Sequence, residues 1–181
     1  KHRRRQRQMC IRDRYLRLAE PDELDIVYLM GFDVWGDGLS LDEYLSCCRS
    51  NGKYSKGTWY VLVEKEQVVS ALIVYSGTFG LQKGCFGLGS IATHPQLRHK
   101  GYASKLIHLV KRELFASKHC KALYLHSDIG QQFYHRLGFV SIEGSDCMYI
   151  ANDSEFKGCL LYTSDSADDD AGVYLGGGRI M

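Results

Sequence analysis

The sequence lacks any apolar run long enough to cross a membrane. A membrane-spanning helix needs about 20 consecutive apolar residues, and polar residues interrupt every apolar stretch of this chain before that length. The layout of a secretory signal peptide, with a basic start, a short apolar core and a cleavage site, is also missing. The sequence therefore predicts a cytoplasmic protein without a membrane partner.

An excess of one charge is also missing. The chain has 23 Lys and Arg residues against 21 Asp and Glu residues, which is a net charge of +2. Residues 1–13 contribute six basic and one acidic residue, and residues 159–181 contribute one basic and four acidic residues. The part between them is neutral, with 16 residues of each sign. A neutral domain has no strong field to attract nucleic acid, so we expect no nucleic-acid partner.

The cysteines lack the spacing of a zinc ribbon. Seven are present, and five lie in the central part of the chain: Cys47, Cys48, Cys85, Cys120 and Cys147. This odd number and irregular spacing do not predict a metal site. We expect reduced, mostly buried thiols and no bound metal, as is usual in the cytoplasm. A catalytic cysteine is the less favoured alternative.

The two ends of the chain are related through the genetic code. One coding of Cys159–Asp165 has a reverse complement that, in a shifted frame, encodes the residues 9–13, Met-Cys-Ile-Arg-Asp. Both ends thus resemble translated sequencing-adapter DNA, and we exclude residues 1–13 and 159–181 from the function, as one excludes expression scars. A genuine basic arm is the alternative for the first of them. We expect neither end to fold, a domain over residues 14–158, and native sequence beyond Gly158 if the fragment was cut early.

Strand and helix patterns follow one another along the central part without internal repeats. Runs rich in β-branched and aromatic residues predict strands, and apolar residues at three- and four-residue spacing predict helices. The predicted strands are 15–18, 58–64, 68–75, 85–93, 122–125, 139–142 and 147–151, and the predicted helices begin near Pro21, Leu41 and Gly101. Ser40 and Glu43 form a capping box for the second helix. This order indicates an α+β fold with a mixed, mainly antiparallel sheet.

The segment Gln96–Ala103 has the layout of an anion-binding site. It follows the predicted strand Cys85–Thr93 and opens an amphipathic helix that runs from Gly101 to about Lys118. The backbone N–H groups of a first helical turn have no intrahelical acceptor, and the helix dipole places partial positive charge there. Gly101 allows a close approach of the backbone, and the basic residues 98–100 add donors. A pyrophosphate is the expected ligand.

Two blocks of residues resemble the signature of the GNAT superfamily of N-acetyltransferases. The first is the Arg-x-x-Gly-x-Ala pattern of residues 98–103, preceded by Ile-Ala-Thr-His-Pro at 91–95. The second is Ala122–Phe139, a strand and a short helix that ends in Phe-Tyr-x-x-x-Gly-Phe. The blocks occur in the expected order with one helix between them, and the resemblance covers roughly residues 15–142. It implies the GNAT fold, in which helices flank a central sheet.

The resemblance assigns the first block to acetyl-CoA. The turn and the helix start are expected to hold the pyrophosphate, and the backbone of the preceding strand is expected to pair with the pantetheine arm. The implied coenzyme-binding residues are Ile91, Ala92, Thr93, Arg98, His99, Lys100, Gly101, Tyr102, Ala103 and Ser104. A plain strand-to-helix connection is the alternative for the glycine turn.

The second block carries the candidate catalytic residues. Tyr134 lies where many GNAT enzymes have the tyrosine that protonates the leaving thiol, and a phenol with a pKa near ~10 is a donor at neutral pH. The stretch in which many relatives have a basic glutamate is occupied here by Gly87, Gly89 and Ser90. His126 is the candidate base, since imidazole has a suitable intrinsic pKa. The alternatives are a packed tyrosine and a hydrogen-bonded histidine at a strand end.

Three further residues are candidates for binding the acceptor: Asp33, Trp35 and Asp128. By analogy with the superfamily, the end of the first helix covers the acceptor site, and an aromatic ring flanked by carboxylates suits an ammonium group. Asp128 follows the strand that carries His126 and could hold a cationic substrate. The alternative for the first pair is a core tryptophan beside a solvated acid.

The sequence thus predicts a single-domain, acetyl-CoA-dependent N-acetyltransferase that is a monomer or a homodimer. The expected mechanism is direct attack of a primary amine on the thioester in a ternary complex. The acceptor stays open between a small amine, an amino acid and a protein amine. The rival interpretation is a non-catalytic module that binds or senses acyl-CoA. Tyr134 favours the enzyme, and the missing strand glutamate favours the rival.

Overall fold

A computed structural model describes residues 14–117, 119–127 and 129–152 of the chain. Its strands are β1 (Arg14–Leu18), β2 (Gly57–Glu64), β3 (Gln67–Ser76), β4 (Cys85–Thr93), β5 (Ala122–His126), β6 (Val140–Ser141) and β7 (Cys147–Ala151). Its α-helices are α1 (Leu24–Leu29), α2 (Phe32–Trp35), α3 (Leu41–Ser50), α4 (Tyr102–Ser117) and α5 (Gln132–His135). Short 3-10 helices are η1 (Pro21–Glu23), η2 (Tyr54–Lys56) and η3 (Pro95–Leu97).

The strands form one mixed sheet with the order β1-β2-β3-β4-β5-β7-β6. Neighbouring strands are antiparallel except β4 and β5, which run parallel. The chain crosses over between these two parallel strands through α4, because a tight turn cannot join parallel neighbours. The expected α+β fold with a mixed, mainly antiparallel sheet flanked by helices is therefore confirmed.

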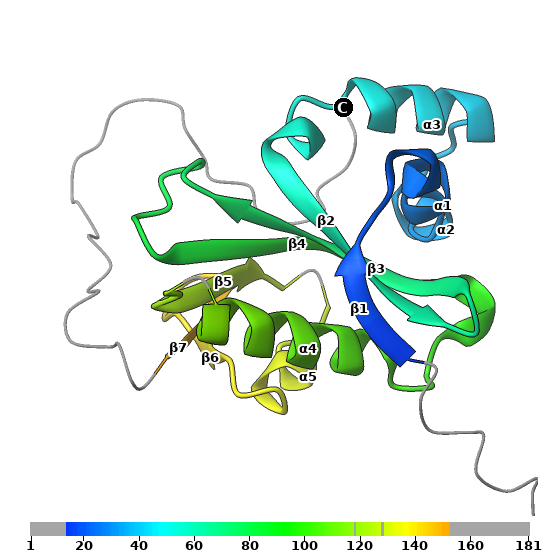
Figure 1. Cartoon of the computed structure of the whole chain (residues 1–181). Helices are drawn as coiled ribbons and strands as arrows, with labels where there is room; N and C mark the ends of the chain where they lie inside the picture. The colour runs from blue at the N-terminus through cyan, green and yellow to red at the C-terminus, as the bar shows by residue number, and fades with distance from the viewer. Residues whose placement is uncertain (1–13, 118, 128, 153–181) are drawn as a thin grey trace, which may run out of the picture.

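Helices cover both faces of this sheet. Figure 1 shows α4 and α5 on one side of it and α1, α2 and α3 on the other. The apolar stripe of α4 is buried against the strands with 0% exposure: Leu106, Ile107, Val110 and Leu114. Burial of each such side chain contributes about 2 kcal/mol. The spacing that predicts the helix from the sequence is thus also the spacing that anchors it.

The helices on the opposite face pack around aromatic side chains. The rings of Tyr28, Tyr54 and Trp59 contact one another with centroid distances between 5.2 and 5.7 Å. The predicted capping box starts α3: the Glu43 carboxylate accepts a hydrogen bond from the Ser40 N–H at 2.9 Å. The separate helix α2 was not predicted, because its four residues are too few to show a helical period.

The parallel strands β4 and β5 pair over only part of their length. Their register joins Cys85–Leu88 with Ala122–Leu125. Beyond that point β4 continues to Thr93, whereas β5 ends after one more residue. Backbone groups along this edge of β4 therefore lack a strand partner on the β5 side and can bind a ligand there.

The adapter-like ends stay a prediction, because residues 1–13 and 153–181 lie outside the described residues. The sheet and the core clusters described above are built from residues 14–152. Removal of Lys1–Asp13 and Cys159–Met181 is therefore expected to leave the melting temperature essentially unchanged. Melting curves of the full and trimmed chains by circular dichroism measure this. A fall of many degrees on trimming would show that the ends belong to the folded domain.

Candidate active site

A cavity with a volume of about 460 Å³ opens where β4 and β5 stop pairing. Its wall is formed by the end of β4, the turn into α4, the end of β5, α5 and the α1–α2 segment. The predicted site residues in this wall are Trp35, Ile91, Ala92, Thr93, Arg98, His99, Gly101, Tyr102, Ala103, Ser104, His126 and Tyr134. Asp33 and Lys100 are not in the wall, and Asp128 lies outside the described residues.

The turn into α4 presents the start of a helix to the cavity. The first helical hydrogen bond of α4 joins the Lys105 N–H to the Gly101 carbonyl at 3.0 Å. The N–H groups of the first turn before it have no intrahelical acceptor. Gly101 has a φ of +79°, and a Cβ added there would meet no atom within 4 Å. The turn therefore leaves open space in front of a helix start, which is where an anion binds.

The side chain of Tyr102 anchors this helix start to the first two strands. Its hydroxyl donates a hydrogen bond to Glu64 at the end of β2. The guanidinium of Arg14 lies over the Tyr102 ring at 4.9 Å from its centroid. The bond to Glu64 raises the pKa of the phenol. Tyr102 thus serves the site by fixing the backbone of the turn, while its hydroxyl is engaged away from the helix start.

The guanidinium of Arg98 reaches across the cavity mouth to the α1–α2 segment. It donates to both carboxylate oxygens of Asp33, at 2.6 and 2.7 Å, and to the carbonyls of Met30 and Thr93, at 3.1 and 3.2 Å. This paired guanidinium lowers the pKa of Asp33. The sequence-based placement of the arginine at the phosphates and the aspartate at the amine stays a prediction. Without a ligand, planar bidentate pairing satisfies both groups at once. The pair ties the α1–α2 segment to the turn into α4.

This ion pair predicts an acid-dependent contribution to stability. Because the pKa of Asp33 is lowered in the folded state, the pair stabilises the protein above the unfolded carboxyl pKa of ~3.9. That contribution is lost as the pH falls through the lowered value. The Asp33 side chain is 46% exposed, so Asp33→Asn is expected to cost no more than about 1 kcal/mol at pH 7.

Melting curves from pH 7 to pH 3 measure this difference. We expect Asp33→Asn to melt roughly 1–3 °C below the parent at neutral pH, and the gap to close in acid. Asp37→Asn is the matched control, because it removes an exposed acid just beyond α2. A gap that persists unchanged at pH 3, or an equal effect of the control, would contradict the contribution assigned to the pair.

A bulge in β4 turns its backbone at the cavity wall. Ala71 pairs with Ala92 and Ile73 pairs with Gly89, so one residue of β3 lies opposite the two residues 90 and 91 of β4. Ser90 has a φ of 45°, in the left-handed region that a non-glycine residue rarely adopts. The extra residue of a bulge is left out of the ladder. The bulge thus gives the cavity main-chain groups that the sequence pattern did not reveal.

Tyr134 is both packed and part of the cavity wall. Its side chain is 6% exposed. Its ring makes edge-to-face contacts with Phe133 and Phe139, at centroid distances of 5.0 and 6.2 Å. The two sequence-based alternatives for this tyrosine are therefore compatible, because the same packing that buries the ring orients it beside the cavity.

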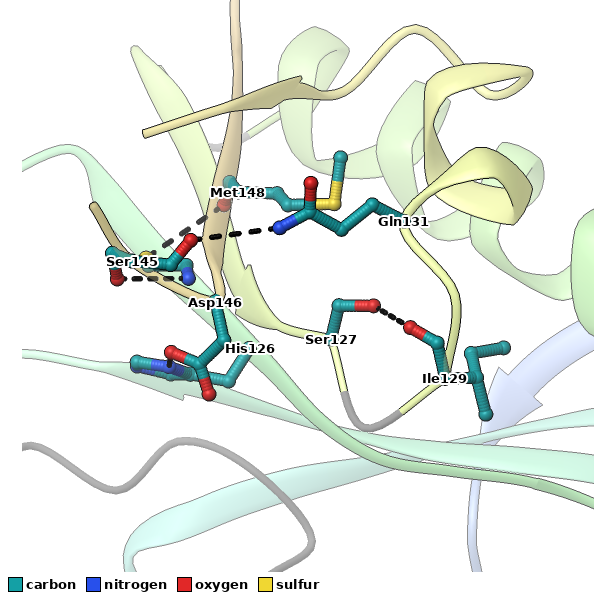
Figure 2. Close-up of polar contacts among 8 residues, drawn as sticks. His126, Ser127, Ile129, Gln131, Ser145, Asp146 and Met148 are labelled. Carbon is teal, nitrogen blue, oxygen red and sulfur yellow. Dashed lines mark hydrogen bonds and ion pairs between the residues drawn. The ribbon is translucent and has the colours of Figure 1, made fainter. Parts of the chain in front are cut away.

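His126 ends β5 and forms a pair with Asp146 of the β6–β7 turn. Its Nδ1 lies 2.8 Å from the Asp146 Oδ1. Figure 2 shows this carboxylate against the imidazole ring. The hydrogen bond from His126 lowers the pKa of Asp146. Sequence reasoning identified the histidine but missed the aspartate, because the turn that carries it has no motif of its own.

Trp35 lines the cavity together with Met30 and Val34. Its ring packs directly over Gly31, where an added Cβ would lie only 2.0 Å from the ring. A glycine is therefore required at this position for the tryptophan to keep its place. Unlike Trp35, Asp33 is not part of the cavity wall and is paired with Arg98. Of the predicted aromatic and carboxylate pair, Trp35 thus lines the cavity, whereas Asp33 forms an ion pair with Arg98.

Neither a metal centre nor a membrane span is evident in the described part of the chain. Within these residues, no three His, Cys, Asp or Glu side chains gather closely enough to hold a metal ion. Their helices are also too short or too polar to cross a bilayer.

Comparison with known proteins gives a family match. The model of the acetyltransferase (GNAT) domain matches residues 55–141. This segment spans the sheet from β2 to β6 and includes the α4 turn, His126 and Tyr134. No curated protein matches the chain.

Solved structures with the same fold come from several bacteria. A GNAT acetyltransferase from Brucella melitensis in complex with acetyl-CoA has a TM-score of 0.57 and 21% identity, over 76% of this chain and 87% of its own. The N152L mutant of the Vibrio cholerae spermidine N-acetyltransferase SpeG has a TM-score of 0.60 and 17% identity, over 80% of this chain and 96% of its own. The GNAT family N-acetyltransferase YhbS from Escherichia coli in complex with CoA has a TM-score of 0.58 and 15% identity, over 77% of this chain and 81% of its own. Residues 55–141 of this chain thus match the model of the GNAT acetyltransferase domain, and the chain shares its fold with solved GNAT acetyltransferases.

Proposed function

We propose that the chain transfers an acetyl group from acetyl-CoA to a primary amine. The observation that carries the proposal is the convergence of three groups on one cavity: the helix start at Gly101, the phenol of Tyr134 and the imidazole of His126. The family match supports acetyl transfer. The presence of acetyl-CoA or CoA in related folds supports the coenzyme.

We place the pyrophosphate of acetyl-CoA at the first turn of α4. The open space beside Gly101 and the helix dipole both favour an anion there. His99 and Lys100 add donors at the edge of the turn, while Arg98 stays bound to Asp33. The pantetheine arm then runs along the unpaired edge of β4, whose peptide groups can pair with its amides.

The two candidate catalytic side chains lie on opposite faces of the sheet. Tyr134 belongs to the core cluster under α4, together with Leu125 of β5. Side chains alternate along a strand, so the next residue, His126, points to the other face, on which α1–α3 pack. This separation supports two different roles: the phenol protonates the departing thiolate, and the imidazole takes a proton from the amine on the acceptor side.

The reaction removes two protons from the ammonium nitrogen and delivers one to the departing thiolate. His126 takes a proton from the ammonium, so that the nitrogen lone pair can attack the thioester carbon. The main-chain groups at the β4 bulge are the candidate donors to the tetrahedral oxyanion. As the carbon–sulfur bond breaks, the Tyr134 hydroxyl donates its proton to the thiolate. The nitrogen then loses its second proton, which restores the phenol of Tyr134, and coenzyme A and the acetylated amine are the products.

Direct attack is favoured over an acetylated cysteine intermediate. Among the described residues, the cavity wall contains no cysteine. Burial raises the pKa of Cys48 and Cys147 to about 11, and that of Cys120 to about 12. Thiols with such values are protonated at neutral pH and are poor nucleophiles. The described cysteines are free, which also agrees with the proposed reducing, cytoplasmic compartment.

A thiol-release assay over a panel of amines tests the proposed function. The panel contains polyamines, amino acids, aromatic amines and a lysine peptide, each with acetyl-CoA and a thiol reagent. We expect at least one amine to accelerate thiol release well above the rate with acetyl-CoA and water alone. Calorimetric binding of acetyl-CoA with no acceleration by any amine would instead support the rival, a module that binds acyl-CoA without transfer.

A further inference from the structure

We infer that Asp146 is a positioning residue that makes His126 a base through its Nε2 atom. The inference rests on the proposed function, because it assigns a partner to the proposed base. It adds a residue that lies outside both sequence motifs, on the turn between β6 and β7. The two residues then form a dyad in which the aspartate orients the histidine and the histidine contacts the substrate.

The turn that carries Asp146 is held by several hydrogen bonds. Its backbone carbonyl accepts from the Ser127 N–H at 3.0 Å, which ties the turn to the residue after His126. The next residue, Cys147, pairs with His126 in the β5–β7 register. The N–H of Cys147 also donates to the Ser145 hydroxyl at 3.0 Å. Figure 2 shows Ser145 and Asp146 together over the end of β5. These contacts hold the backbone of the turn, from which the Asp146 side chain, 65% exposed, reaches the imidazole.

The charge of Asp146 determines which imidazole nitrogen carries the proton. The pKa of this carboxyl is lowered, so the group is ionised at neutral pH and can only accept a hydrogen bond. The Nδ1 atom, 2.8 Å away, must then be the donor. In the neutral imidazole the remaining nitrogen, Nε2, holds the lone pair. A base with this tautomer accepts a proton at Nε2 and at no other atom.

The same carboxylate stabilises the product of proton transfer. When the N–H bond of the ammonium breaks and the Nε2–H bond forms, His126 becomes an imidazolium that already faces a negative charge. The imidazolium then returns its proton to solvent, and the carboxylate itself takes none. The His126 side chain is 17% exposed and lines the cavity, while its Nδ1 atom faces Asp146.

Other titratable groups of the described site do not take the place of Asp146 as the partner of His126. Cys147 on β7 is neutral at pH 7, because burial raises its pKa to about 11. Tyr134 on α5, Tyr102 on α4 and the two side chains of the turn, Arg98 and His99, line the same cavity. None of them is the partner of the Nδ1 atom, which is Asp146. A change that removes only the Asp146 charge therefore tests the dyad itself.

The test compares Asp146→Asn with Glu143→Gln, which removes an exposed acid from the same turn. For Asp146→Asn we expect kcat to fall on the order of 10–100-fold, a part of the full effect of general base catalysis. The affinity for acetyl-CoA stays unchanged by calorimetry. Asp146→Glu restores part of the rate, and Glu143→Gln behaves as the parent.

Two further measurements exclude a purely structural role. In a His126→Ala background, Asp146→Asn is expected to have no additional effect on kcat, since the partner through which it acts is gone. Nitrogen-15 NMR of the imidazole is expected to show the Nδ1–H tautomer in the parent and a weaker preference in Asp146→Asn. A proton on Nε2 in the parent, or an equal kcat of parent and Asp146→Asn, would overturn the dyad. If no amine accelerates thiol release by the parent, the proposed function is overturned. The NMR result would still decide whether His126 and Asp146 are paired.

Discussion

Replacing Gly101 with aspartate is expected to weaken acetyl-CoA binding by at least ~100-fold, which corresponds to ~2.7 kcal/mol. The Cβ position at Gly101 is open, so the carboxylate would occupy the space that we assign to the pyrophosphate. It would also place a negative charge at a helix start, where anionic ligands otherwise gain from the dipole. Isothermal titration calorimetry measures the affinity, and circular dichroism confirms that the fold is kept.

Two matched variants separate the causes of this effect. Gly101→Asn adds nearly the same bulk without the charge, and we expect it to retain more affinity than the aspartate. Gly80→Asp carries the same substitution at another open glycine, with a φ of +70°. Because it lies outside the cavity wall, we expect normal binding. Normal binding by Gly101→Asp, or an equal loss in Gly80→Asp, would refute the placement of the pyrophosphate.

Replacing Tyr134 with phenylalanine is expected to lower kcat by about 100-fold, within the usual range for loss of a general acid. The aromatic packing against Phe133 and Phe139 is kept, because only the hydroxyl is removed. The affinity for acetyl-CoA should therefore change little. A loss that appears in kcat rather than in binding is the signature of an interaction made in the transition state.

The matched control for this variant is Tyr149→Phe on β7. Tyr149 stacks on Tyr124 at a centroid distance of 6.1 Å and is not part of the cavity wall. We expect its kcat to equal that of the parent. If Tyr134→Phe also keeps the parent kcat with the best acceptor amine, the phenol does not protonate the thiolate. The tyrosine is then a packing residue alone.

Local sequence patterns predicted the elements of this fold because each pattern has a local cause. The stripe Leu106–Leu114 follows the period of a helix, and the same side chains are buried in α4. Ser40 and Glu43 cap α3 through their own hydrogen bonds. The helix start at Gly101 also follows from neighbours in sequence. The last strands were less predictable: the expected strand 139–142 is only Val140–Ser141.

The pairings within the candidate site could not be predicted in the same way. Arg98 and Asp33 are 65 residues apart, and His126 and Asp146 are 20 apart. No local pattern indicates which charged residues meet when strands and turns come together. The bulge at Ser90 depends on the register with β3, which only the folded sheet defines. The sequence thus indicated the candidate groups, and the tertiary structure determined their partners.

The fate of a carbon-13 label in the acetyl group of acetyl-CoA tests the central claim most directly. With an acceptor amine and the full chain, NMR should show the thioester carbonyl signal replaced by an amide carbonyl signal. We expect one amide for each coenzyme A released, with no label retained on the protein. A label that stays in the thioester across the whole amine panel, or that appears only as free acetate, would contradict transfer to an amine.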